Sequence, residues 1–194
     1  IMSASTATNT VETEPMLAPH GRLGMWMFLA SEVVVFGGLL ASYIFARLRH
    51  SSWDEFASQT MTSIGCINTV LLLTSSLFIV LSHHWAERKD IKKSGKYMLW
   101  AILLGVLFLV FKGYEYQHEF AKGITPLTNL FWSYYFFITG LHALHIVIGL
   151  VINALTLREI RKGQNLQRVE VAGLYWHFVD VVWIFVFPLF YVAS

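Results

Sequence analysis

The sequence is poor in charge and in cysteine. Only 13% of its 194 residues are Asp, Glu, Lys or Arg, and 56% are hydrophobic, whereas soluble domains carry about 25% charged residues. The single cysteine, Cys66, excludes an intrachain disulfide and a cysteine-rich metal cluster. The formal net charge of +2 gives no indication of a nucleic-acid partner. We therefore expect one compact domain that is integral to a membrane and binds no nucleic acid.

A signal peptide is also missing from the first twenty residues. The stretch IMSASTATNTVETEPMLAPH is rich in Ser and Thr, and it lacks a basic region followed by an apolar core. We predict a flexible amino-terminal tail over residues 1–20, followed by a membrane domain over residues 21–194.

Long apolar runs dominate the remainder. About 20 consecutive apolar residues form a helix that spans a bilayer, and five windows qualify, at about 24–46, 62–82, 97–114, 132–157 and 173–193. The windows lack the alternation of membrane barrel strands, and the links between them are short. Gly37, Gly38, Gly140 and Gly149 would permit close approach of neighbouring helices. The sequence thus predicts an all-α bundle of five transmembrane helices.

The basic residues predict an orientation for this bundle. Ten of the 14 fall on the side of the amino terminus and of the second and fourth links, namely Arg22, Arg88, Lys89, Lys92, Lys93, Lys96, Arg158, Arg161, Lys162 and Arg168. The other side has Arg47, Arg49, Lys122 and the borderline Lys112. Because cytoplasmic loops are enriched in Lys and Arg, we expect a cytoplasmic amino terminus and an outward carboxyl terminus.

Five ionisable residues within the windows are candidates for buried polar contacts or proton handling, because ionisable groups are costly in hydrocarbon. With a rise of 1.5 Å per residue, Glu32, His177 and Asp180 lie within roughly 12 Å of the cytoplasmic end, while His145 and His142 lie roughly 18 and 22 Å deep. No comparable titratable group is expected further outward. Proton pumping by this chain alone is therefore not expected, while local proton handling near the cytoplasmic surface stays open.

The histidines raise the question of a metal. His177 misses the depth of His142 and His145 by roughly 12 Å or more, which argues against a shared haem. A non-haem site built from His142, His145 and a carboxylate is geometrically possible, although no Glu-x-x-His motif supports it. The alternative is that the imidazoles bond to backbone or hydroxyl groups. His177 and Asp180, three residues apart, can bond each other on one helix face, or Asp180 can pair with a neighbouring helix.

Five stretches resemble a known family, subunit III of the haem–copper respiratory oxidases. In order they are GRLGMWMFLASEVVVFGG (21–38), INTVLLLTSSLFIVLSHHW (67–85), FKGYEYQHE (111–119), FFITGLHALHIVIGL (136–150) and YWHFVDVVWIFVF (175–187). The resemblance covers all five windows, and WHFVDVVW is its most specific part. Glu32 stands in the place of the family's intramembrane Glu.

The resemblance implies a bundle docked on oxidase subunit I, which holds the haems and copper, in a complex with subunit II and further subunits. It implies no active site and no redox cofactor in this chain. Members typically have seven helices, and the five windows here match the last five, as in short bacterial forms, so the implied location is a bacterial inner membrane. Arg158 resembles the family's phospholipid-binding arginine, which implies a bound phospholipid.

Within the family, Ser31–Glu32 and His83–His84 favour cytochrome c oxidase over quinol oxidase. A quinol oxidase subunit III and an accessory subunit of a nitric oxide reductase are the alternatives. A hypothesis of another class is a self-contained membrane metalloenzyme that uses His142 and His145.

Overall fold

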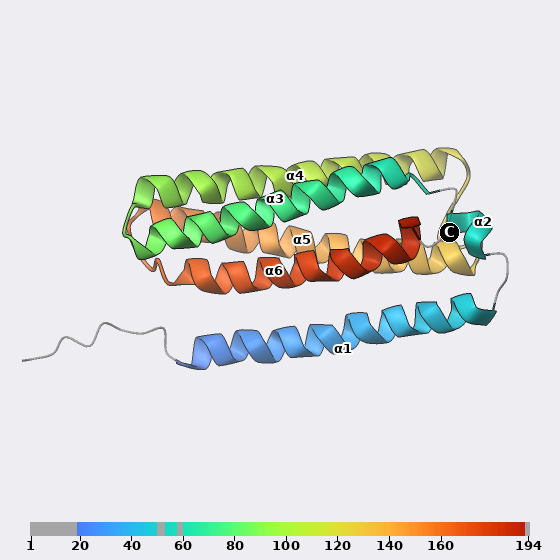
Figure 1. Cartoon of the computed structure of the whole chain (residues 1–194), viewed down its shortest axis with the longest axis horizontal. Coiled ribbons are helices and arrows are strands. Elements are labelled where there is room, and N and C mark those ends of the chain that lie inside the picture. The colour runs from blue at the N-terminus through green and yellow to red at the C-terminus, as the bar shows by residue number, and fades with distance from the viewer. Residues whose placement is uncertain (1–18, 50–52, 58–59, 193–194) are drawn as a thin grey trace, which may run out of the picture.

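The structure, a computed structural model, describes residues 19–49, 53–57 and 60–192. Five helices in it are long and apolar enough to cross a membrane, and no strand occurs in these ranges, which confirms the all-α prediction. The elements in chain order are α1 (Pro19–Arg49), α2 (Trp53–Ala57), α3 (Thr62–Glu87), α4 (Ile91–Ala121), α5 (Leu130–Arg161), α6 (Arg168–Phe187) and the π-helical turn η1 (Pro188–Val192) (Figure 1). Most of the predicted tail, residues 1–18, lies outside the described ranges.

Helices α1, α3, α4 and α5 are longer than the apolar windows that predicted them. Helix α4 begins at Ile91 rather than near residue 97, because Asp90 caps it by accepting a hydrogen bond from the backbone N–H of Lys93 at 3.0 Å. Helix α5 begins at Leu130, where Asn129 accepts from the N–H of Trp132 at 2.9 Å. Such caps let a helix continue beyond its apolar segment. The short helix α2, within the first link of the chain, has no counterpart among the predicted windows.

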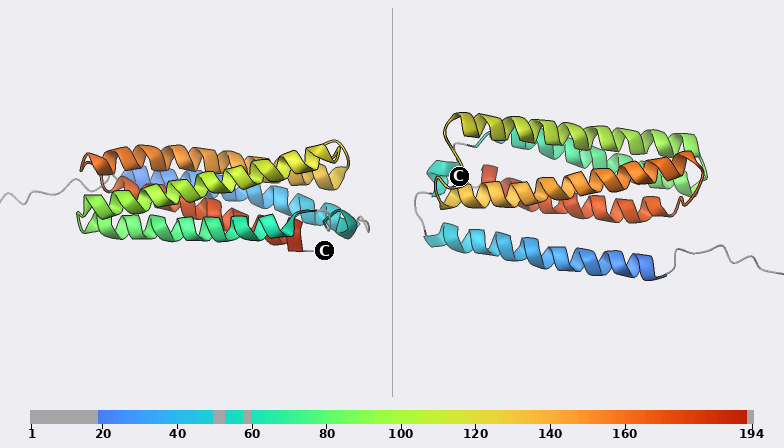
Figure 2. Two further views of the ribbon diagram at one scale, coloured as in Figure 1. Left: turned by 90° about the horizontal axis from the view of Figure 1, so that it is seen from above. Right: turned by 180° about the vertical axis from the view of Figure 1, so that it is seen from behind.

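Helices α3, α4, α5 and α6 form a four-helix bundle, and α1 lies along the side made by α5 and α6 (Figures 1 and 2). Each helix runs antiparallel to the next long one. We call the end of the bundle where α1, α4 and α6 begin the N-side, and the end where α6 and η1 finish the C-side. Helix α1 is the least buried of the five.

Small residues let one indole fill the bundle. Trp176 of α6 is fully buried between Gly105 of α4 and Gly149 of α5. A Cβ atom at either glycine would lie 2.7 or 2.8 Å from an indole carbon, closer than van der Waals contact allows. The predicted close approach at Gly149 is confirmed. At Gly37 and Gly38 of α1, by contrast, no atom lies within 4 Å of such a Cβ.

Candidate functional site

Polar side chains gather in two regions of the bundle, and an aromatic layer separates them. On the N-side, Glu32 of α1 reaches His145 of α5, with 3.2 Å between Oε2 and Nε2. The other ring nitrogen of His145, Nδ1, lies 2.8 Å from the carbonyl oxygen of Leu141. A carbonyl only accepts, so Nδ1 carries a proton and the Glu32–His145 contact shares a second one. Both side chains are largely buried, and they tie α1 to the bundle.

His177 and Asp180 lie on α6 and face α3, and they do not bond each other. The Nδ1 atom of His177 lies 2.5 Å from Oγ of Ser76 on α3. Ser76 is also the polar neighbour of Asp180, yet neither carboxylate oxygen of Asp180 has a hydrogen-bond partner among the described residues. Of the two alternatives for Asp180, the bond to His177 is therefore not formed, because Ser76 of α3 is the partner of His177. Glu32, Ser76, His145, His177 and Asp180 are called the N-side cluster below.

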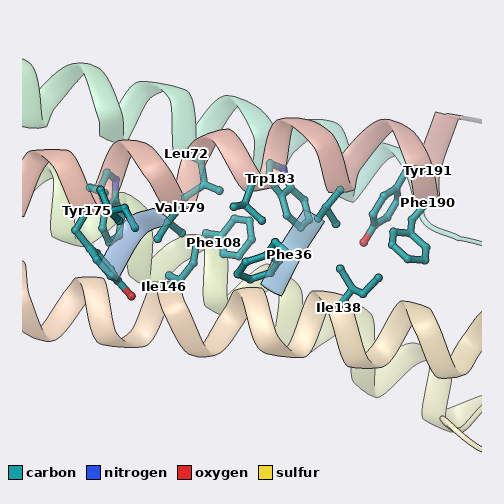
Figure 3. Close-up of a cluster of buried hydrophobic side chains, with 14 of the residues drawn as sticks. Phe36, Leu72, Phe108, Ile138, Ile146, Tyr175, Val179, Trp183, Phe190 and Tyr191 are labelled. Atoms are coloured by element: carbon teal, nitrogen blue, oxygen red, sulfur yellow. The ribbon is translucent and has the colours of Figure 1, made fainter. Parts of the chain in front are cut away.

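His142 lies in an apolar layer rather than in a polar site. Its ring stacks on Trp183 with 5.2 Å between centroids and meets Phe108 edge-on at 5.8 Å. Phe108 and Trp183 in turn meet edge-on at 5.0 Å, so the three rings close an aromatic triangle; Figure 3 shows Phe108 and Trp183 within the buried core. Neither ring nitrogen of His142 has a hydrogen-bond partner among the described residues, a deficit that costs about 1–3 kcal/mol for a buried polar group.

This geometry bears on the metal hypothesis. His142 turns toward Trp183 and Phe108, whereas His145 turns toward Glu32. Within the described part of the chain, no three His, Cys, Asp or Glu side chains converge in a way that could hold a metal ion. The contacts given to the two histidines are those of helix packing and of one imidazole–carboxylate pair.

On the C-side, a second polar region was not foreseen from the sequence. Lys112 and Glu115 of α4 are 2% and 0% exposed, and their side chains lie 3.0 Å apart. Lys112 had been placed at the border of a link, yet it points into the bundle. The i, i+3 spacing of a Lys and a Glu within FKGYEYQHE was a signal for this pair, because the stretch continues directly from an apolar window.

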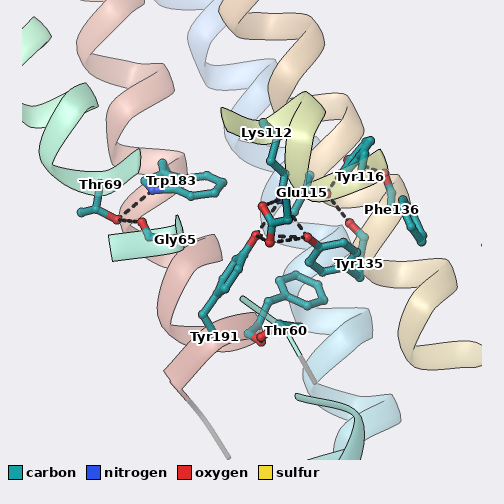
Figure 4. Close-up of polar contacts among 12 residues, drawn as sticks. Thr60, Gly65, Thr69, Lys112, Glu115, Tyr116, Tyr135, Phe136, Trp183 and Tyr191 are labelled. Atoms are coloured by element: carbon teal, nitrogen blue, oxygen red, sulfur yellow. Dashed lines mark hydrogen bonds and ion pairs between the residues drawn. The ribbon is translucent and has the colours of Figure 1, made fainter. Parts of the chain in front are cut away.

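Two tyrosines complete this region, which Figure 4 shows in close-up. The hydroxyls of Tyr135 (α5) and Tyr191 (η1) donate to Oε1 of Glu115 at 2.8 and 2.7 Å. The ammonium of Lys112 donates to Oε2 of Glu115 and to both hydroxyl oxygens, at 3.0 Å to Tyr135 and 2.6 Å to Tyr191. All three N–H donors of the lysine and both oxygens of the glutamate thus have partners. These four residues are called the C-side network.

The charged line continues to the C-side surface. Glu119, one turn beyond Glu115 and 1% exposed, pairs with Lys122 at 3.2 Å, and the side chain of Lys122 is 39% exposed. Titratable groups therefore occupy the C-side half as well. The prediction that no such group continues outward was wrong, because Glu115 and Glu119 were assigned to a polar link, whereas α4 continues to Ala121 and buries both.

Arg158, predicted to contact a lipid head group, is exposed near the N-side end of α5 and forms no ion pair with another described residue. A groove of about 290 Å³ lies between α5 and α6 at this end; its lining includes Leu155 and Glu159, which flank Arg158 in sequence, but not Arg158 itself. Its walls are mostly apolar and include Leu155, one turn before Arg158, while its polar edge is the ion pair of Glu159 with Arg168 at 3.3 Å.

Comparison with known proteins bears on the whole of this arrangement. The family model described as cytochrome c oxidase subunit III matches residues 5–194. The chain belongs to the cytochrome c oxidase subunit III family. The matched range includes all five long helices, and with them the N-side cluster, the aromatic triangle and the C-side network.

Two relatives align with the chain over nearly its whole length. A protein named probable quinol oxidase subunit 3 from Staphylococcus haemolyticus (strain JCSC1435) is 31% identical, with 96% of each chain covered. Its namesake from Staphylococcus aureus (strain USA300) is 29% identical with the same coverage. The chain is thus a multi-pass membrane protein of the subunit III family of haem–copper oxidases, a family whose members associate with other oxidase subunits.

Proposed function

We propose that this chain is the non-catalytic subunit III of a proton-pumping terminal oxidase in a bacterial inner membrane. In this role it packs against subunit I, which holds the haems and copper, and against subunit II and further subunits. The observation that carries the proposal is the family match over residues 5–194, which includes every helix of membrane-spanning length. The bias of ten basic residues to four supports a cytoplasmic N-side.

The surface of the bundle is suited to a subunit buried among lipids and neighbours. Large apolar side chains are exposed along α1, such as Val34 at 75%, Phe45 at 67% and Leu48 at 79%. A helix that is apolar on most of its faces is stable only within hydrocarbon or against other apolar helices. Helix α1 therefore offers the broadest area for contact with a partner subunit.

Co-purification tests this function directly. The chain is tagged and expressed together with the other oxidase genes of its own operon in an aerobic bacterial host. We expect it to co-purify with a haem-containing subunit in fixed stoichiometry. The chain separated from the complex should show no haem absorbance. A stoichiometric haem in the separated chain, or a complex without any haem protein, would contradict the proposal.

The electron donor of the proposed oxidase is either cytochrome c or a quinol. Ser31–Glu32 and His83–His84 favour cytochrome c, whereas the names of the two relatives favour a quinol. The second candidate is therefore subunit III of a quinol oxidase. Oxygen consumption by the purified complex with reduced cytochrome c, measured beside its consumption with a soluble quinol, decides between the two donors.

A phospholipid is the ligand that we propose for the N-side end. The exposed guanidinium of Arg158 can bind a phosphate bidentately at head-group depth, and the groove between α5 and α6 at this end has apolar walls for an acyl chain. We expect Arg158→Ala to lower the amount of co-purifying phospholipid and to leave the initial turnover rate nearly unchanged. Phosphorus content and the first seconds of oxygen consumption are the measurements, with Lys162→Ala as a matched surface control. Loss of activity from the first turnover would contradict this supporting role.

A further inference from the structure

The aromatic triangle has polar groups on either side of it, along three different helices. Helix α4 carries Phe108 and then, one turn toward the C-side, Lys112. Helix α6 carries Trp183 and, one turn toward the N-side, Asp180. On α5, His145 lies one turn to the N-side of His142. Phe108, His142 and Trp183 therefore lie at about the same depth in the bundle, with the carboxyl and imidazole groups on the N-side of them and Lys112 on the C-side.

From the N-side, polar groups lead inward as far as this layer. A cavity of about 170 Å³ between α3 and α6 is lined in part by His83, Glu170 and His177, and the side chain of His83 is 34% exposed. His177 contacts Ser76 at 2.5 Å, and Ser76 neighbours Asp180. This N-side half-path ends at Asp180, which is 4% exposed.

From the C-side, a second half-path leads inward along one face of α4. It starts at the partly exposed Lys122, which pairs with Glu119 at 3.2 Å. One turn further inward on the same face, Glu115 pairs with Lys112 at 3.0 Å. Glu119 also acts electrostatically on Lys112. The ammonium of Lys112 is the innermost group, and it lies 5.7 Å from the centre of the Trp183 ring.

Among the described residues, no hydrogen bond joins Asp180 with Lys112 across the layer. Phe108, His142 and Trp183 are 0%, 1% and 1% exposed. The one N–H of the Trp183 side chain points away, to Oγ1 of Thr69 on α3 at 3.0 Å, as Figure 4 shows. Neither nitrogen of His142 has a partner in the described ranges. The charged groups that act on His142 are Lys112 of α4 and His145 of α5.

A proton crosses a membrane protein along a connected series of titratable groups or waters, and apolar constrictions stop conduction by excluding water. We infer that the aromatic triangle is a proton-tight barrier between the two half-paths, and that His142 is its one titratable member. The barrier lets the chain hold buried acids and bases in both halves of the membrane without conducting protons between them. This inference goes beyond the proposed function and requires only that the chain spans a membrane.

Replacing Trp183 by a second imidazole tests the barrier. The complex that contains Trp183→His is reconstituted into liposomes with an internal pH-sensitive dye, a proton gradient is imposed without electron donor, and the decay of the gradient is measured. We expect the wild-type complex to be tight and Trp183→His to raise the proton leak by about tenfold or more, because His142 and the new imidazole together connect Asp180 with Lys112.

Three matched variants sharpen the result. Trp183→Phe keeps the layer apolar and is expected to stay tight. Trp100→His places the same imidazole on an exposed face of α4, where Trp100 is 48% exposed, and is also expected to stay tight. Adding His142→Phe to Trp183→His is expected to restore the wild-type leak.

Other outcomes overturn the inference. A leaking wild-type complex, or an assembled Trp183→His complex that stays tight, would show that the triangle is not the barrier. A leak that persists in the double variant would remove His142 from the role assigned to it. If Trp183→His does not assemble, Phe108→His makes the same test at another corner of the triangle, with the same expected leak and the same two ways to fail.

Discussion

The N-side cluster and the C-side network both hold carboxylates inside the helical bundle, but they differ in how fully those carboxylates are satisfied. Glu115 receives hydrogen bonds from Lys112, Tyr135 and Tyr191 on both of its oxygens. Asp180, equally removed from the surface, receives none from the described residues. A fully satisfied buried network fixes a fold, whereas an unsatisfied buried acid is a cost that function must justify. The satisfied C-side network therefore has the features of a structural anchor, whereas local proton handling in the N-side cluster stays a prediction.

Removing the cation of the C-side network should produce the largest effect. Lys112→Met leaves the buried carboxylate of Glu115 without its charge partner, which we expect to cost about 3–5 kcal/mol and to lower the yield of assembled complex. The double variant Lys112→Met, Glu115→Leu should recover much of this loss, because both charges are then absent. Thermal denaturation of the purified complex is the measurement.

Lys93→Met is the matched control for that experiment, since the side chains of Lys93 and its partner Asp90 are 53% and 33% exposed, and a surface pair contributes about 0–1 kcal/mol. Equal losses from Lys112→Met and Lys93→Met would show that the C-side network is no anchor.

The Glu32–His145 contact should matter less. Glu32→Gln keeps a hydrogen-bonding group opposite His145 but removes the ionisable carboxyl, so we expect a loss of about 1–2 kcal/mol with assembly intact. The readouts are subunit stoichiometry and thermal denaturation, with Ser31→Ala as control because the Ser31 hydroxyl bonds only to its own helix at Phe28. A complex that lacks the chain would instead make Glu32 a structural requirement.

Asp180 provides the opposite test. Because its carboxylate has no partner among the described residues, Asp180→Leu removes an unsatisfied polar group, and we expect the stability of the complex to change by less than about 1 kcal/mol. The activity and proton uptake of the complex are measured in parallel. A loss as large as that of Lys112→Met would show that a partner subunit satisfies Asp180 in the complex.

Asp90 is a reference carboxylate outside the helices, and its effect should be the smallest. The backbone N–H of Lys93, which donates to its side chain, lowers the pKa of Asp90 below its ordinary value of 3.8. A lowered folded-state pKa stabilises the protein above the unfolded pKa, and this contribution is lost as the pH falls through the folded pKa. The melting-temperature difference between wild type and Asp90→Ala should therefore shrink below about pH 4. Asp90→Asn, which retains the cap, should show little difference at any pH.

The five long helices could be predicted from the sequence because bilayer thickness dictates the length of each apolar run. Helix ends did not follow, since caps such as Asp90 and Asn129 extend helices into polar sequence. Glu32 and His145 were recognised as buried polar residues, but their pairing depends on how α1 docks, which no local pattern encodes. Gly37 and Gly38 show the same limit, because small residues permit close approach without specifying a neighbour.

The C-side network was missed for a physical reason. Glu115 and Glu119 fall in the link after the apolar window 97–114, and a lysine near a window end, such as Lys112, is expected to reach the interface. Lys112 instead turns inward, because Tyr135 and Tyr191 offer hydroxyl acceptors from two other elements. Partners that lie 23 and 79 residues away along the chain come together only in the folded bundle, so no local pattern reveals them.

The π-helical turn η1 is the last part of the C-side network to be synthesised. Lys112, Glu115 and Tyr135 emerge from the ribosome and enter the membrane long before Tyr191, which follows Lys112 by 79 residues. Until then the ammonium of Lys112 has two acceptors for its three N–H groups, and the C-side network is incomplete. Docking of Tyr191 therefore completes the C-side network. A chain stalled or cut before this turn would keep an incompletely satisfied charge within the bilayer and would be open to quality-control proteolysis.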